Sequence, residues 1–318
     1  MDGKAKRTVI ITVVVLVIAG GVFIGLRGCT VMPWNKKAAG SGMVSISITR
    51  DLGSQVIKTG QVKPATGETD MDLLKRIADV KTEYGGGFVS SIEGIASTQG
   101  QGRKDWFYYV NGVLSGQGAG QFQARPGDAV WWDYHAWNND SFIASVVGSY
   151  PQPFVRGYSA EKLPSTVVFG AGMESLARDV GAYLAKNGAT VTYSSQARSF
   201  KRTKGPSIVF LDVKEAAGLQ WVADLVSRPG KALVSLEGGK LAALDATGKP
   251  PANGSPLQAA VLSTGTGMGD ASPVWIVVCD GAAGAAAARR VLVSDPASLA
   301  LKVGAAIGPD GQVNAVGR

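Results

Sequence analysis

The chain has 318 residues, of which 45% are hydrophobic and 18% are charged. This balance excludes a wholly disordered protein, and the length corresponds to about two ordinary domains. Glycine is frequent, at 43 residues, but it follows no three-residue period, which excludes a collagen-like chain. Two cysteines and one histidine are too few for a zinc finger, an iron–sulfur cluster or a disulfide scaffold.

The net charge of +8 is concentrated near the N-terminus. Residues 1–50 contain seven basic residues and one acidic residue, which leaves only +2 for residues 51–318. A nucleic-acid-binding domain would carry its basic residues on a folded face, so no nucleic-acid partner is expected. The later basic run from Arg198 to Lys204 is interpreted as a solvated connection.

A long apolar segment lies between the N-terminal basic residues. Residues 8–26 carry no charge, and as a helix they would extend about 28 Å, close to the hydrocarbon thickness of a bilayer. Residues 1–30 therefore predict a single transmembrane helix that serves as a membrane anchor or signal segment. With its short tail in the cytoplasm, this helix would place the bulk of the chain on the extracytoplasmic side of the cell membrane.

Two fates remain open for this segment. The residues from Leu26 to Cys29 resemble a bacterial lipobox, in which the segment is cleaved and the cysteine is lipidated, although Arg27 stands where that motif has a small or aliphatic residue. The apolar run is longer than a cleavable signal core of about 7–15 residues, which favours an uncleaved anchor. In either case the protein is tethered to the membrane, and residues 31–42 form a linker.

Residues 43–148 are expected to form an α+β domain. Val44, Ile46 and Ile48 alternate with polar residues, as in a half-buried strand. The further elements expected here are a strand at 55–62, a helix that starts in a capping box at 69–72, and extended structure over 88–95.

Two turn signals frame the most aromatic part of this domain. The Asn111-Gly112 pair between apolar residues is typical of a type I′ hairpin, because both positions accept a positive φ. The Pro126-Gly127 pair predicts a second tight turn that leads into a strand at 129–136. Several strands around a single helix favour a β-grasp-like fold.

The residues around these turns resemble a known family. The pattern is formed by Trp106, the run from Tyr108 to Gly112, the run from Pro126 to Asp128, Trp131 and Tyr134. It resembles the transcobalamin C-terminal-like domain family, a β-grasp domain of unknown function in bacterial surface proteins. The resemblance covers residues from about 43 to 138. It implies a β-grasp fold, an exported location and a ligand face related to that of vitamin B12 carriers. The chain lacks the helical domain that supplies much of the corrinoid contact in the eukaryotic carriers.

Residues 149–164 are expected to be a second linker, and residues 165–318 an α/β domain. Strands that alternate with helices predict a parallel sheet covered on both faces. The expected strands are 166–169, 190–193, 207–211, 232–236 and 273–279, and the expected helices are 175–186, 215–226 and 282–293.

The glycines of this domain invite a nucleotide-binding interpretation, which their context does not support. Gly170 and Gly172 lie between an expected strand and an expected helix, the setting of a phosphate-binding turn. Ser175 stands where the dinucleotide-binding pattern has its third glycine, and no Walker lysine follows. Tight turns between strand and helix explain these glycines.

Catalytic and metal-binding chemistry also has no clear basis in the sequence. His135 is the only imidazole and is interpreted as a hydrogen-bonded structural residue, while Cys279 lies in an apolar strand and is expected to be buried. No nucleophile-elbow motif is present. We therefore expect no enzymatic activity, no metal site and no cofactor.

Aromatic residues are the main candidates for a binding function. Nine of the 24 aromatic residues lie between Trp106 and Trp137. Neighbouring residues of a strand point to opposite faces, and one helix can cover only one face of the sheet. The other face either packs on the second domain or is exposed to bind a ligand or partner. The candidate ligand-binding residues are Trp106, Tyr108, Tyr109, Trp131, Trp132 and Tyr134.

The sequence thus predicts a membrane-anchored extracytoplasmic binding protein that captures a small molecule, such as a corrinoid, for uptake. The alternative is a structural or adhesive cell-envelope protein with no small ligand. The expected partners are the lipid bilayer, through the N-terminal segment, a small-molecule ligand, and an envelope or transporter protein.

Overall fold

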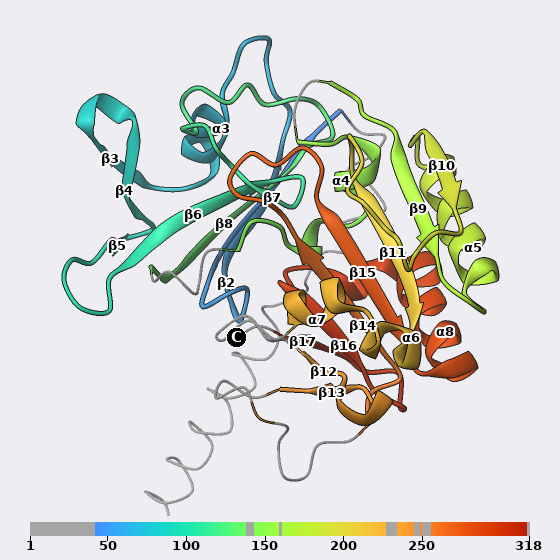
Figure 1. The fold of residues 1–318 in the computed structure, drawn as a ribbon. Helices are drawn as coiled ribbons and strands as arrows, with labels where there is room; N and C mark the ends of the chain where they lie inside the picture. The colour runs from blue at the N-terminus through green and yellow to red at the C-terminus, as the bar shows by residue number, and fades with distance from the viewer. Residues whose placement is uncertain are drawn as a thin grey trace, which may run out of the picture. The chain divides into compact units, whose positions relative to one another are not determined.

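The computed structural model describes residues 42–137, 143–158, 161–226, 234–244, 249 and 256–316 (Figure 1). All of them belong to one compact unit, residues 35–318. The predicted membrane segment, residues 31–41 of the predicted linker at 31–42, and the lipidation candidate Cys29 lie outside the described residues. Among the helices of the described part, none is both long and apolar enough to cross a bilayer.

The first sheet has five strands in the order β2-β1-β8-β6-β7. The parallel pair β1 and β8 lies at its centre, and the other neighbours are antiparallel. A three-stranded antiparallel sheet, β3-β4-β5, lies beside it (Figure 1). The bounds are β1 Val44–Arg50, β2 Gln55–Val62, β3 Val80–Glu83, β4 Phe88–Ile92, β5 Ile95–Ala96, β6 Lys104–Val110, β7 Val113–Leu114 and β8 Ala129–Ala136, with a short 3-10 helix at Tyr84–Gly86.

One helix, α3 (Asp70–Ile77), packs on the first sheet, and its start follows from local hydrogen bonds. The Thr69 side chain accepts a hydrogen bond from the main-chain nitrogen of Asp72, and the Asp72 carboxylate accepts one from that of Thr69. This is the predicted capping box, which satisfies two main-chain donors at the helix start. Leu73 and Leu74 are fully buried against the sheet.

The predicted turns are also present. Asn111 and Gly112 have φ angles of 50° and 80°, as a type I′ turn requires, and they connect the antiparallel strands β6 and β7. The second turn is closed by a hydrogen bond of 3.0 Å from the main-chain nitrogen of Asp128 to the carbonyl of Arg125, with Gly127 at a φ of 89°. Strand β8 follows directly from it.

The second sheet has seven strands in the order β10-β9-β11-β15-β14-β16-β17. The first four are mutually parallel, whereas β14, β16 and β17 are antiparallel, so the sheet is mixed rather than wholly parallel. The bounds are β9 Ser165–Phe169, β10 Val191–Ser194, β11 Ser207–Asp212, β14 Ala259–Thr264, β15 Val274–Cys279, β16 Gly304–Ile307 and β17 Val313–Val316.

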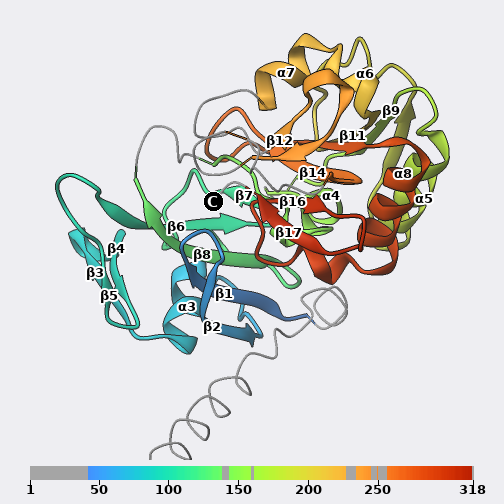
Figure 2. The ribbon, with the colours of Figure 1, turned by 90° about the horizontal axis from the view of Figure 1, so that it is seen from below.

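Both faces of the second sheet are covered (Figure 2). One face packs on α5 (Glu174–Lys186) and α8 (Gly281–Arg289), and the other on α6 (Val213–Ala217) and α7 (Gln220–Val226). The helix expected over 215–226 is therefore two short helices. The short ribbon of β12 (Val234–Ser235) and β13 (Ala242–Ala243) forms a separate sheet, so the strand expected at 232–236 does not extend the large one.

Residues 149–164, expected as a linker, contain packed structure. A 3-10 helix, Val147–Ser149, ends at the first residue of this range, and α4, Gln152–Val155, lies within it. Tyr150 and Phe154 are 1% and 2% exposed and belong to the apolar core beneath α5. The segment is packed because its large aromatic side chains are buried in the core. The turn-forming residues around them indicated only a linker. Further along the chain, a π-helical segment at Arg290–Ser294 continues α8, and short 3-10 helices lie at Glu237–Gly239 and Pro296–Leu299.

The aromatic residues of the first sheet are buried on both of its faces. Trp132 faces the core around α3, and Trp131 faces the opposite side, yet they are only 2% and 1% exposed. The second face is covered by residues 143–150 and by Leu301: the carbonyls of Gly112 and Ala144 form hydrogen bonds with the main chain across this contact. Of the two possibilities that the sequence left open for this face, the structure shows the packed one.

Candidate functional site

The carboxyl edge of the second sheet has the geometry of a ligand site. Strand β9 is followed along the chain by β10 on one side of it and by β11 on the other. The chain leaves β9 toward α5 and leaves β11 toward α6, and these helices lie on opposite faces of the sheet. The connecting segments therefore diverge between β9 and β11, and such a divergence point is where open α/β sheets bind ligands.

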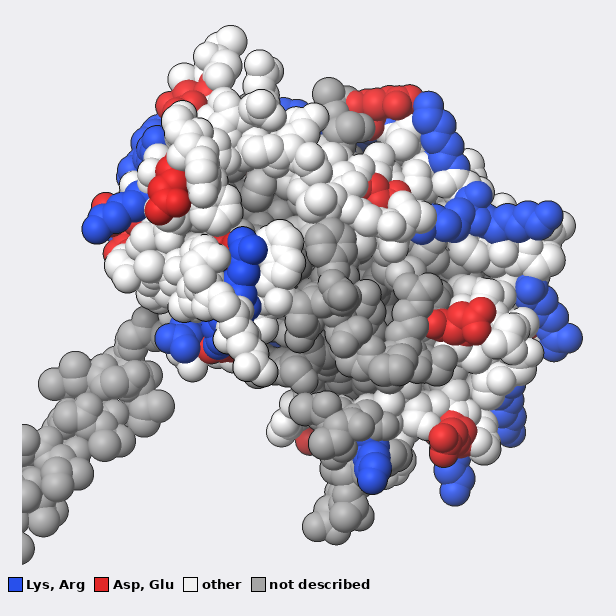
Figure 3. All heavy atoms as spheres, turned by 60° about the vertical axis from the view of Figure 1, so that its left-hand side comes forward, with Lys and Arg blue, Asp and Glu red and all other residues white. Residues whose placement is uncertain are grey.

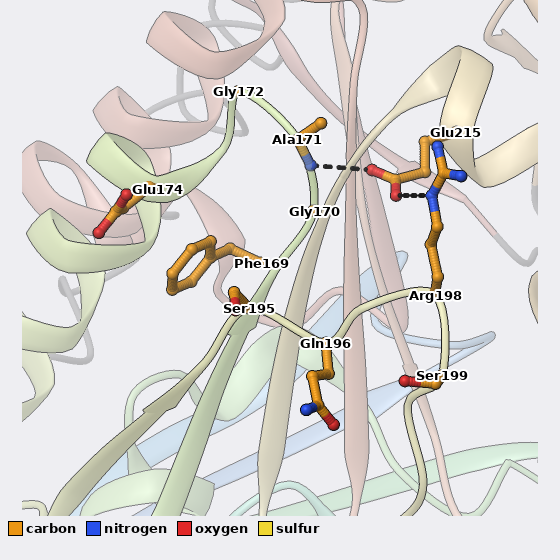
Figure 4. Close-up of a pocket in the computed structure, with 10 residues that line it drawn as sticks. All are labelled: Phe169, Gly170, Ala171, Gly172, Glu174, Ser195, Gln196, Arg198, Ser199 and Glu215. Atoms are coloured by element: carbon orange, nitrogen blue, oxygen red, sulfur yellow. Dashed lines mark hydrogen bonds and ion pairs between the residues drawn. The ribbon is translucent and has the colours of Figure 1, made fainter.

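A hollow of about 610 Å³ lies at this edge (Figure 4). Its volume falls within the range of about 300–1,000 Å³ that is usual for small-molecule pockets. The turn after β9, the start of α5, the segment after β10 and the helix α6 all contribute to it. The lining residues are Phe169, Gly170, Ala171, Gly172, Glu174, Ser195, Gln196, Arg198, Ser199 and Glu215.

The turn after β9 is shaped by a carboxylate. The main-chain nitrogen of Ala171 donates a hydrogen bond of 3.1 Å to Oε2 of Glu215. A Cβ atom at Gly170 would overlap the same oxygen, so glycine is required there for the close approach of the carboxylate. Gly172 has a φ of 74°, which leads the chain into α5.

Arg198 holds the second oxygen of this carboxylate. Its Nε lies 2.9 Å from Oε1 of Glu215. The side chain of Glu215 is 8% exposed, whereas that of Arg198 is 78% exposed. Figure 4 shows the two meeting beside the glycine turn, with Glu174 on the other side of the hollow and Gln196 and Ser199 below. Glu215 is thus a buried anion bound by one main-chain donor and one guanidinium group.

A second hollow of about 410 Å³ borders the same segment. It shares Gln196 and Ser199 with the first. Hydroxyl groups dominate its polar lining, and Thr166 and Thr203 place their oxygens 3.2 Å apart. The lining residues are Thr166, Val168, Ser194, Gln196, Ser199, Phe200, Lys201 and Thr203.

The basic run of this segment is largely ion-paired. Arg198 pairs with Glu215, Arg202 with Asp270 and Lys204 with Glu161. Burial opposes ionisation of Asp270, but hydrogen bonds from the main chain of Thr266 and Ser272 and from Arg202 give its carboxyl a lowered pKa. These pairs hold the segment in place along the rim of both hollows. On the face shown in Figure 3, basic and acidic residues are likewise interspersed rather than gathered into one basic area.

The sequence-predicted site residues lie elsewhere, in the first sheet. They meet in three cross-strand pairs, with ring centroids 5.2 Å apart for Trp106 and Tyr134, 4.7 Å for Tyr108 and Trp132, and 5.6 Å for Tyr109 and Trp131. Each of the six is 9% exposed or less. Burial raises the pKa of Tyr108 and of Tyr109. These rings are packed and offer no open surface to a ligand.

The single histidine and the cysteine of the second sheet are buried as well. His135 lies 2.8 Å through Nδ1 from Oδ1 of Asp133, and its ring stacks on Phe107 at 4.1 Å. The pKa of the Cys279 thiol is raised to about 12, mainly by burial and to a lesser extent by the charge of the nearby Asp212. Across the described residues, no group of three or more His, Cys, Asp or Glu side chains is arranged to hold a metal ion.

Sequence reasoning missed the residues that form the hollow. The Gly170 and Gly172 pair was the available signal, but it was compared only with phosphate-binding patterns. Glu215 and Arg198 are 44 and 27 residues from Ala171 along the chain, and only the pairing of β9 with both β10 and β11 brings them together.

Comparison with known proteins adds a partial family match. The model of a family described as a domain of unknown function, DUF4430, matches residues 67–136, which contain α3 and the strands β3 to β8. No curated protein is significantly similar to the chain. Among solved structures, a "putative metal binding protein" from Ruminococcus gnavus is similar over 30% of this chain and 98% of its own, at 13% identity and a TM-score of 0.26. A likeness at this level carries no argument about fold or function.

Proposed function

We propose that the protein is a non-catalytic binding protein, tethered to the outer face of a membrane by residues 1–30, that holds a small polar ligand in the hollow between β9, β10 and β11. The observation that carries this proposal is the coincidence of a pocket-sized hollow with the divergence point of the parallel strands. The tether rests on the sequence of residues 8–26.

The lining chemistry favours binding over catalysis. The hollow is lined by amide, hydroxyl, carboxylate and guanidinium groups, and its described lining includes neither histidine nor cysteine. Its most buried carboxylate, Glu215, already accepts hydrogen bonds on both oxygens, which removes it as a free base. Such a set can orient a ligand by hydrogen bonds without providing a nucleophile.

For the first domain we propose a β-grasp-like fold and kinship with the transcobalamin C-terminal-like domain family. A central parallel pair flanked by hairpins and covered by α3 supports this fold. The family match at 67–136 lies within residues 43–138, the range that the resemblance covers. The six aromatic residues proposed there as ligand-binding are buried, so we place ligand capture in the second domain. A corrinoid is retained as one ligand to be tested, and capture for uptake remains the purpose we propose.

The test is ligand binding by the full chain held in lipid nanodiscs. Native mass spectrometry would look for a co-purifying molecule, and thermal shifts would be measured with a panel of small metabolites that includes corrinoids. Gln196→Trp should fill both hollows and abolish binding, because Gln196 lines each of them. Gln61→Trp, at an exposed position of the edge strand β2, is the matched control and should bind normally.

Two results would refute the proposal. One is that no ligand binds or co-purifies, which would favour the alternative of a structural or adhesive envelope protein. The other is that Gln196→Trp binds a ligand as tightly as the unmodified chain, which would place the binding site elsewhere.

A further inference from the structure

The position that usually binds phosphate in a parallel α/β fold is already filled in this protein. At that position a main-chain N–H at the turn after a strand, with glycine to allow close approach, meets the anion at the start of the following helix. Here the N–H of Ala171 donates to Glu215, and the space left by Gly170 is occupied by the same carboxylate. The chain supplies its own anion.

The cation that could attract a second anion is engaged as well. Nε of Arg198 donates to Oε1 of Glu215, so the charges of the two side chains offset each other at this site. Glu174 adds a further carboxylate to the lining, and it too is paired, with Arg178 at 2.8 Å. A phosphate brought to the turn would therefore approach Glu215 at short range without an uncommitted cation from this set to compensate.

The remaining lining groups suit hydroxyl groups. Ser195, Ser199 and Gln196 each offer a donor and an acceptor, which is what a ligand hydroxyl needs, since it both donates and accepts. Phe169 adds an apolar ring to the same hollow, which can pack against the C–H face of a ligand ring. Neutral donors and acceptors beside an apolar ring match a polyhydroxylated ring compound.

The second hollow extends this chemistry along the segment after β10. It shares Gln196 and Ser199 with the first hollow and adds the hydroxyls of Thr166, Ser194 and Thr203, together with the ring of Phe200. The one cationic group of its described lining, Lys201, is not among the residues that line the first hollow at the glycine turn. A ligand with several hydroxylated rings could therefore contact both hollows. This repetition points to an oligosaccharide rather than a single sugar.

We infer that the hollow binds a neutral saccharide and rejects phosphorylated ligands, because the Glu215 carboxylate occupies the anion position of the glycine turn. This inference rests on the proposed function, since it names the ligand class of the same site. The saccharide could be a free oligosaccharide or part of a neutral envelope polymer.

The experiment compares neutral and charged ligands on the full chain in nanodiscs. Isothermal titration would use neutral oligosaccharides, the same sugars carrying a phosphate, and a nucleoside diphosphate. We expect the neutral oligosaccharides to bind at least about tenfold more tightly than their phosphorylated forms. Sedimentation with an insoluble neutral polysaccharide would separate the two sources: co-sedimentation points to a polymer, and binding in titration alone points to a free oligosaccharide.

Glu215→Gln is the informative variant. Its amide oxygen can still accept from Ala171, so the turn should persist, and a thermal melt would verify the fold. The amide cannot also hold Arg198, which bonds the second carboxylate oxygen, so the charge is removed and the guanidinium is released together. Both changes should raise the affinity for phosphorylated sugars by about tenfold relative to the affinity for the neutral sugars. Glu83→Gln, at an exposed position of β3, is the control and should leave the preference unchanged.

The failures are distinguishable. Tighter binding of a phosphorylated sugar or nucleotide by the unmodified chain, or an unchanged preference in Glu215→Gln, would overturn the saccharide inference while leaving a binding function in place. Absence of binding by every ligand class would overturn both the inference and the proposed function.

Discussion

The main-chain carbonyl of Leu301 lies against Gly53 so closely that a Cβ atom at residue 53 would overlap it. Gly53 lies in the turn between β1 and β2, and Leu301 in the segment that precedes β16. The same Cβ atom would also lie 3.1 Å from the ring of Trp131. The segment before β16 thus meets the turn between β1 and β2 beside the ring of Trp131.

Gly53→Ala should therefore destabilise the protein for two reasons. Gly53 has a φ of 81°, which costs any other residue about 1–2 kcal/mol, and the overlap with Leu301 should add about 1–3 kcal/mol of overpacking. Gly67→Ala is the control, because Gly67 has a φ of 84° with no neighbour near its Cβ position. Denaturant unfolding would compare the two, and equal losses would show that the contact with Leu301 contributes nothing.

Asp70 should make the stability of the protein depend on pH. Its carboxyl is fully buried, and neither oxygen has a hydrogen-bond partner among the described residues. Burial, with Asp128 nearby and Arg125 acting in the opposite direction, raises its pKa to about 8. In the unfolded chain this group ionises near pH 4, so the folded state holds an extra proton between pH 4 and 8, and stability should fall as the pH rises through that range.

Asp70→Asn should remove most of this fall, since the amide cannot ionise. A shift of this size corresponds to a loss on the order of 5 kcal/mol in the unmodified chain between pH 4 and 9. Urea unfolding at several pH values would measure it. Asp79→Asn, at an exposed position just beyond α3, should keep the slope of the unmodified chain. A parallel slope in Asp70→Asn and the unmodified chain would contradict the prediction.

Trp131→Ala and Trp132→Ala should both cost about 3–5 kcal/mol, because each removes a fully buried aromatic side chain. Trp131 also donates a hydrogen bond of 2.7 Å to Thr49. Trp137→Ala is the control: this ring is 49% exposed and should cost less than about 1 kcal/mol. Thermal melts would report the losses, and a small loss in only one of the first two variants would mean that one face of the sheet is open.

Deletion of residues 1–30 should yield a soluble, folded chain. The cores of the described part are built from residues 44–316, which lie within one compact unit of residues 35–318, so we expect the deletion to leave them intact. The melting temperature should lie within about 3 °C of that of the full chain in nanodiscs. An unfolded or insoluble product would contradict the model of a folded part on a membrane tether.

Local sequence signals predicted the elements of the first sheet well. The strand at 129–136 and the hairpin at Asn111-Gly112 follow from period-two alternation and turn chemistry, which act over a few residues. Asn111 does more than turn the chain: its side chain also bonds Asp128, Gly157 and the main chain of Ala129, each within 2.9 Å. A local sequence pattern cannot predict these hydrogen-bond partners, because they are 17 to 46 residues away along the chain.

The covering of the aromatic face and the composition of the hollow could not be read in this way. Gly53, next to the ring of Trp131, meets Leu301 about 250 residues further along the chain, and Glu215 reaches the glycine turn because β9 lies between β10 and β11. β14, β16 and β17 also escaped prediction; β16, with the sequence GAAI, is mostly alanine and glycine, which carry a weak strand signal. Both features depend on the order of the strands in the sheets, which involves residues far apart in the chain and cannot be predicted from local sequence patterns.

Residues 143–150 serve both sheets at once. Val146 donates to the carbonyl of Gly112 in the first, while Val147 donates to that of Val303 beside the second. The first domain is therefore not a portable module in this chain, although a family model recognises most of it. A fragment cut after residue 137 would expose the rings of Tyr109 and Trp131 to water. It would have to recruit another apolar surface, most simply a second copy of itself, to shield them.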